Sequence, residues 1–346
     1  MSPALPNITS PMLGGRCGLK QDKEAVVSVM VRPTHTPVLM VQVVDALRPA
    51  LGAGATLLDA TLGLGGHSAA LLEACPGTRL VGIDRDGEAL ALAGERLAGF
   101  DGVTLVRARF DELADVLDDA GVSAVQGMLF DLGLSSLQID EAERGFAYTQ
   151  DGPLDMRMDD RLVVTAADIV NTWPDADLAR VIRDFGEEPH ALRVAQAIVV
   201  ARQHAPISTT GKLAEVVAAA MPAAVRYGSG GHPAKRVFQA LRIATNDELT
   251  SLARALPVAL RRLAVGGRLA VISYHSLEDR LVKQSFRAAS TTQAPRRLPV
   301  VPTSLQPRFA LVTEQAIRPS EAEVEANSRA ASARMRVIAR VREDLS

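Results

Sequence analysis

Cysteine, aromatic residues and long apolar runs are all scarce in this chain of 346 residues. Its two cysteines, Cys17 and Cys75, cannot form a disulfide framework or a cysteine-rich metal cluster, and no other metal-ligand spacing stands out. No stretch reaches the ~18 consecutive apolar residues of a membrane helix. Aromatic residues make up only 3% of the chain, which disfavours broad stacking on single-stranded nucleic acid. These absences favour a globular cytoplasmic protein.

The composition is that of a chain with a sizeable core. Hydrophobic residues make up 47% and charged residues 23%, enough for one large or two ordinary domains. Residues 1–32 differ, because they mix Pro, Gly, Ser and charges without the apolar stretch of a secretory signal. We expect a disordered N-terminal extension there, and Met30 is an alternative start.

The net charge of −2 hides an asymmetry along the chain. Residues 1–225 hold 18 basic and 30 acidic residues, whereas residues 226–346 hold 20 basic and 10 acidic ones. The basic C-terminal third indicates either a polyanionic partner or a solvated basic surface.

Apolar runs and helical patterns alternate, which predicts a doubly wound, Rossmann-like α/β sheet. The runs that read as strands are 55–60, 79–84, 103–107, 124–131 and 268–273. Residues 263–267 read as a helix end with its glycine stop. Residues 309–317 and 334–341 alternate like strands and predict an antiparallel pair that closes the sheet.

About 135 residues separate the fourth and fifth predicted strands, far more than a crossover helix needs. Helical patterns fill this interval, at 165–185, 190–203, 210–221 and 233–263. We therefore predict an all-helical subdomain at 139–241, inserted into a core formed by 33–138 and 242–346.

A glycine-rich turn after the first strand predicts a cofactor crevice. Gly63, Gly65 and Gly66 permit a sharp turn and leave bare backbone beside a ligand. Asp84 ends the next strand, where an acidic residue accepts hydrogen bonds from ribose hydroxyls. A dinucleotide site has a third glycine where this chain has Ser68, so the spacing favours S-adenosylmethionine over NAD. An NAD-dependent oxidoreductase is the alternative from another class.

The fourth strand ends in polar groups that we expect beside this crevice. Asp131 emerges first, Gly133 permits close backbone approach, and Ser135, Ser136 and Gln138 follow. The Asn-Pro-Pro-aromatic pattern of simple DNA amino-methylases is not met.

Eight motifs in order closely resemble the ribosomal RNA small subunit methyltransferase H family, over about His35 to Arg342. They are His35–Leu39, Asp59–Ser68, Gly82–Asp86, Asp131–Ser136 with Gln138, Glu143–Phe146, Asp151–Asp159, Phe238–Ile243 and Ser273–Asp279. One departure is Leu137, where the family commonly has Pro. The resemblance implies methylation, by S-adenosylmethionine, of the N4 amine of a decoding-centre cytosine in 16S rRNA of the small ribosomal subunit. Methylation of another nucleic acid is the alternative. The resemblance also implies that the cofactor is lined by Gly65, Gly66, His67, Asp84, Phe110, Asp131 and Gln138.

Several residues have two interpretations. Asp131 either accepts a hydrogen bond from N4–H or only binds the cofactor, with Ser135 as a further catalytic candidate. Phe110 packs on the adenine or in the core. Tyr274 and His275 flank the target base or pack the turn before Ser276–Asp279, which matches a helix-start motif.

The helix pattern from Lys235 onward carries one polar stripe. Lys235, Gln239, Arg242 and Asn246 fall on one helix face, which suits either an RNA backbone or solvent. The predicted RNA contacts are Lys235, Arg236, Arg242, Arg296 and Arg297.

Overall fold

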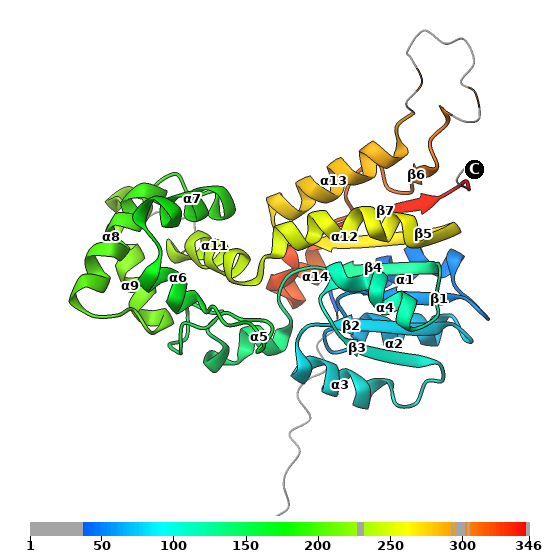
Figure 1. Ribbon diagram of the computed structural model, residues 1–346, viewed down its shortest axis with the longest axis horizontal. Helices are drawn as coiled ribbons and strands as arrows, with labels where there is room; N and C mark the ends of the chain where they lie inside the picture. Colours follow the sequence, from blue (N-terminus) through cyan, green and yellow to red (C-terminus); the bar gives the residue numbers. More distant parts are fainter. Residues whose placement is uncertain (1–36, 227–231, 293, 295–301, 303–304, 344–346) are drawn as a thin grey trace, which may run out of the picture. The chain divides into compact units, whose positions relative to one another are not determined.

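A seven-stranded sheet lies at the centre of the part of the chain that the structure describes. The computed structural model describes residues 37–226, 232–292, 294, 302 and 305–343. The strand order is β3-β2-β1-β4-β5-β7-β6 (Figure 1). The strands are β1 Thr56–Asp59, β2 Arg79–Asp84, β3 Val103–Arg107, β4 Val125–Asp131, β5 Leu263–Ser273, β6 Phe309–Leu311 and β7 Arg334–Arg340. The predicted doubly wound α/β sheet is confirmed, while the predicted extension 1–32 lies outside the described residues.

The first five strands are parallel, and their order reverses between β1 and β4. Carboxyl ends of strands diverge at such a reversal and leave room for a ligand. β7 pairs antiparallel with both β5 and β6, so the predicted antiparallel closure is confirmed. β6 is shorter than the predicted run, because Ile317 forms only an isolated bridge with Met335.

Helices cover both faces of the sheet and bury its apolar side chains, as parallel strands require. One face packs against α1 Met40–Leu47, α2 Gly66–Ala74 and α3 Gly87–Leu97. The other packs against α4 Leu113–Asp119, α12 Glu248–Arg262 and α13 Ser276–Ser290. Short elements complete these layers: α5 Ser136–Asp140, α14 Glu321–Ala326 and the 3-10 turns Arg48–Ala50, Phe110–Glu112, Ala142–Arg144 and Ser328–Ser332.

The segment between β4 and α12 builds a second apolar core. Its helices are α6 Ala166–Thr172, α7 Asp175–Gly186, α8 Ala191–His204, α9 Thr210–Ala220, α10 Ala223–Arg226 and α11 Ala234–Asn246. The predicted helix 165–185 is two helices, because Pro174 precedes α7 and cannot donate a backbone hydrogen bond. The predicted helix 233–263 is also two, separated by Asp247 in the left-handed conformation at φ 50°.

Two features differ from the sequence analysis near the end of this segment. Residues 263–267 are not a helix end: α12 stops at Arg262 and β5 begins at Leu263. Leu263 pairs with Val125, and the register then shifts across Gly266, whose φ is +82°. Pairing with β4 therefore outweighs the local glycine signal. The predicted boundary at Leu241 falls inside α11, so we propose that the insertion extends to Asn246.

Candidate active site

Asp131, at the end of β4, is the centre of a buried polar cluster. Its Oδ1 accepts a hydrogen bond of 2.8 Å from the Tyr274 hydroxyl, and its Oδ2 lies 3.5 Å from Nδ1 of His67. Tyr274 follows β5 and His67 lies at the start of α2, so the crevice brings together residues far apart in sequence. The Asp131 side chain keeps 24% of its surface exposed, whereas His67 keeps 6%. A small ligand group can therefore still reach the Asp131 carboxylate.

The hydrogen bonds of His67 determine where a proton is held in this cluster. Its Nε2 lies 2.9 Å from the carbonyl oxygen of Val38, which can only accept, so Nε2 carries a hydrogen. In the neutral ring Nδ1 then presents a lone pair to the Asp131 carboxylate. Burial raises the pKa of Asp131, while His67 and the Tyr274 hydroxyl oppose that rise. Two acceptor atoms, Oδ2 of Asp131 and Nδ1 of His67, then face each other 3.5 Å apart, so a proton released beside them can be bound by both.

Asp59, at the end of β1, is connected to this pair through hydrogen bonds of its neighbours Ser68 and Thr61. It accepts hydrogen bonds from the Ser68 hydroxyl at 2.6 Å and the Thr61 amide at 3.2 Å. The Thr61 hydroxyl accepts in turn from the Asp131 amide at 2.5 Å. Burial raises the pKa of Asp59 to about 6, against the opposing effects of Ser68 and His67. Ser68, which occupies the place of a third glycine, thus ties α2 to β1.

The glycine turn is fastened to the end of β2. The Gly63 amide donates to Oδ2 of Asp84 at 2.7 Å, and the Asp86 amide donates to Oδ1 at 2.9 Å. Gly63 and Gly65 adopt positive φ, and no atom lies within 4 Å of where a Gly63 Cβ would be. Gly66 admits no side chain, because its Cβ would lie 2.5 Å from Cγ of Pro37. Asp84 holds the turn, and each of its oxygens keeps a lone pair for a further donor.

Ser135 and Gln138 hold the loop after β4. Ser135 caps α5: its hydroxyl accepts from the Gln138 amide, and the Gln138 side chain accepts from the Ser135 amide. The Gln138 amide group also donates to Asp86 at 3.0 Å, and Arg144 donates to the same carboxylate at 2.7 Å. Sequence reasoning assigned no role to Asp86, although its place before α3 carried an N-cap signal.

Phe110 lies in the sheet core and is only 9% exposed. Its ring meets Phe130 edge-on with centroids 5.9 Å apart, and the Arg85 guanidinium lies 5.6 Å from its centroid. The geometry shows the core packing, and contact with adenine stays a prediction.

The turn after β5 is held by Glu278, which sequence reasoning did not single out. Glu278 accepts from the Tyr274 amide at 2.8 Å and lies 3.1 Å from Nε2 of His275. His275, rather than the predicted Ser276, is the N-cap of α13, and Glu278 is its capping-box partner. The spacing from Ser276 to Asp279 signalled a helix start but was one residue late. His275 is buried against Glu278, so its predicted contact with a base has no support in this geometry.

An ion pair adjoins this turn. Arg242 on α11 binds Glu248 through two contacts of 2.9 and 2.8 Å. Ligand atoms of Glu248, His275 and Glu278 lie within 4.8 Å of one another, which is close enough to hold a metal ion. The Arg242 guanidinium already supplies positive charge there, so the cluster is explained as an ion-pair network.

Comparison with known proteins decides the family. The model of the MraW methylase family matches residues 32–341. The chain belongs to this family. Membership rules out the oxidoreductase alternative. Ribosomal RNA small subunit methyltransferase H of Streptomyces avermitilis is 55% identical, over 91% of this chain and 99% of that protein. Its counterpart in Thermobifida fusca is 56% identical, over 90% and 94% respectively. An rRNA methylase structure from Streptococcus thermophilus aligns with 91% of this chain and all of its own, at 13% identity and a TM-score of 0.38.

Of the predicted polar stripe of α11, only Lys235 is exposed. Asn246 is 1% exposed, and its amide group bonds the backbone of Met156 and Met158. Arg242 is occupied by Glu248, and the Gln239 amide donates to the carbonyl of Phe185. Gln239 and Asn246 thus face backbone from elsewhere in the chain, and Arg242 faces the Glu248 carboxylate.

The other predicted RNA contacts divide into two groups. Lys235 and Arg236 are exposed, although Arg236 also lies 3.7 Å from Glu188. Arg296 and Arg297 lie outside the described residues.

Among the helices that the structure describes, none combines the length and apolar character needed to cross a membrane.

Proposed function

We propose that this methylase transfers a methyl group from S-adenosylmethionine to the N4 amine of a decoding-centre cytosine in 16S rRNA, within the small ribosomal subunit. The meeting of Asp131, Tyr274 and His67 beside the glycine turn carries this proposal. The printed names of the relatives support ribosomal RNA as the substrate. Work on ribosomal subunits would place the protein in the cytoplasm.

The glycine turn fits the cofactor. The open space at Gly63 and the free lone pairs of Asp84 suit a ribose and an amino acid group lying against bare backbone. S-adenosylmethionine, when bound, supplies a methyl group on a positively charged sulfur. The chain must then hold the amine and receive its proton.

Asp131 is suited to both tasks. The cytosine N4 lone pair is delocalised into the ring, and its nitrogen gains positive charge as it forms a new bond. A carboxylate that accepts a hydrogen bond from N4–H stabilises this charge. Oδ2 of Asp131 and Nδ1 of His67 then take the released proton, while Tyr274 keeps the carboxylate oriented through Oδ1.

Ser135 is not needed for this step, because its hydroxyl is engaged in capping α5. Lys235 and Arg236 stay candidates for contact with the RNA backbone. The contact of Arg242 stays a prediction too, although its guanidinium pairs with Glu248.

The direct test offers labelled S-adenosylmethionine with small ribosomal subunits or with DNA as acceptor. We expect label in the 16S rRNA alone, on N4 of one cytosine when the digested RNA is mapped by mass spectrometry. Label in DNA would favour the other nucleic acid, and an unchanged decoding-centre cytosine in cells lacking the protein would overturn the proposal.

A further inference from the structure

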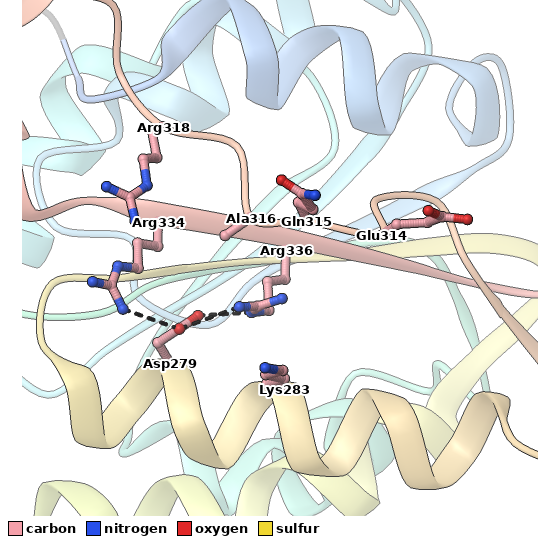
Figure 2. A pocket seen from close by; sticks show the side chains of 8 residues that line it. All are labelled: Asp279, Lys283, Glu314, Gln315, Ala316, Arg318, Arg334 and Arg336. Carbon is pink, nitrogen blue, oxygen red and sulfur yellow. Dashed lines mark hydrogen bonds and ion pairs between the residues drawn. The ribbon is translucent and has the colours of Figure 1, made fainter.

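A basic pocket of about 220 Å³ lies between α13 and the segment that leads into Arg318 (Figure 2). Four cationic and two acidic side chains line it, with Gln315 and Ala316 beside them. They are Lys283, Arg318, Arg334, Arg336, Asp279 and Glu314. The cations exceed the anions by two, so the pocket suits an anionic ligand.

Asp279 neutralises only part of this charge. Its Oδ1 accepts from Nε of Arg336 at 2.7 Å, and its Oδ2 accepts from Nη1 of Arg334 at 3.2 Å. Figure 2 shows both guanidinium groups reaching Asp279 between α13 and β7. Arg334 donates from one nitrogen and keeps 38% of its side chain exposed, so its other N–H donors stay available, whereas Arg336 donates from two nitrogens and keeps only 13%. Lys283 and Arg318 are exposed and form no ion pair with any residue that the structure describes.

The pocket includes a residue at the same carboxyl end of β5 as the proposed reaction centre. Arg334 pairs in the sheet with Ser273, the residue directly before Tyr274. Asp279 lies one helical turn after His275, and its amide bonds the His275 carbonyl. A group bound here would lie toward the same end of β5 as a base that contacts Asp131.

We propose that this pocket binds a backbone phosphate of the RNA substrate next to the target nucleotide. Lys283 and Arg318 provide the uncompensated charge, and Arg334 offers N–H donors that are directed by Asp279. The assignment rests on the proposed function, because RNA is the anion that would bring a phosphate to this edge of the sheet. It extends the RNA contacts beyond α11 to α13 and β7.

Binding of the full chain to small ribosomal subunits tests the pocket without requiring turnover. The double variant Lys283→Ala/Arg318→Ala should weaken binding about tenfold and make the dependence of log affinity on log salt shallower by about one. Glu314→Gln should strengthen binding, because it removes an exposed negative charge from the pocket. The matched control Arg48→Ala/Arg261→Ala removes two exposed cations at the opposite, amino ends of the strands and should leave the salt dependence unchanged.

Unchanged affinity and salt slope in Lys283→Ala/Arg318→Ala would overturn the proposal that this pocket binds a phosphate. This holds even where the wild-type chain methylates 16S rRNA. Conversely, a wild-type chain that binds subunits through the pocket but transfers no methyl group would overturn only the proposed function. Inorganic phosphate at millimolar concentration should compete with subunits for the wild-type chain more strongly than for the double variant. Equal competition would show that phosphate acts elsewhere and would also contradict the pocket.

Discussion

Asp131 and Asn246 are both polar residues at the ends of secondary-structure elements, yet their surroundings differ. Asn246 is 1% exposed, and its oxygen and nitrogen bond the backbone of Met158, Met156 and Arg242. Asp131 has two side-chain neighbours and keeps 24% of its surface exposed. A polar side chain whose hydrogen bonds are all to other groups of the protein stabilises the fold. One that stays partly exposed can also bind a ligand.

Asp131→Asn should have the largest effect on activity. We expect kcat to fall about a thousandfold with little change in unfolding free energy, because the amide cannot accept a proton. Rates of labelled methyl transfer and denaturant unfolding would measure the two. Asp119→Asn, at the exposed end of α4, is the matched control. A raised KM for S-adenosylmethionine with unchanged kcat would instead make Asp131 a cofactor ligand.

Asn246→Ala should show the opposite pattern. It leaves the Met158 amide and the Met156 carbonyl buried without partners, so we expect about 3 kcal/mol loss of unfolding free energy. Activity per folded molecule should change little. Gln203→Ala, an exposed amide on α8, should cost less than about 0.5 kcal/mol. If Asn246→Ala keeps full stability but loses activity, then Asn246 does not act mainly by stabilising the fold.

Tyr274→Phe should lower kcat about tenfold and move the pH profile. Activity requires the Asp131 carboxylate, so it falls as pH drops through the raised pKa of that residue. The Tyr274 hydrogen bond lowers this pKa, and removing the hydroxyl raises it further. The acid limb of log kcat against pH should therefore move to higher pH. Tyr148→Phe should leave the acid limb in place. If Tyr274→Phe also leaves it in place, then Tyr274 does not influence the Asp131 carboxylate during the reaction.

Lys235→Ala should have the smallest effect, a loss of about threefold in affinity for small subunits with unchanged thermal stability. Lys235 is the exposed member of the predicted stripe, whereas Arg242 is not. Lys212→Ala on α9 is the matched control. If Lys235→Ala binds like the wild type, then the exposed residue of the stripe has no role in RNA binding.

The order of motifs along the chain was enough to predict the sheet and the glycine turn, and it singled out Asp84 and Asp131, whose roles stay predictions. Strand periodicity and turn chemistry are local properties, and parallel strands necessarily bring their carboxyl ends to one edge. The helix boundaries at Pro174 and Asp247 were missed, because the same periodicity runs through them.

Tertiary structure decided which polar groups are used inside the protein and which stay open. The pattern of α11 shows that Arg242 and Asn246 share a face, but only folding brings Glu248 and the 156–158 backbone against it. The same is true of His67, whose tautomer depends on the carbonyl of Val38, and of Glu278 beneath Tyr274. The bonds of Asn246 to the 156–158 backbone and of His67 to Val38 join residues distant in sequence, whereas those of Arg242 to Glu248 and of Tyr274 to Glu278 span six and four residues. A one-dimensional pattern records the side chain and its spacing but not the partner that completes it.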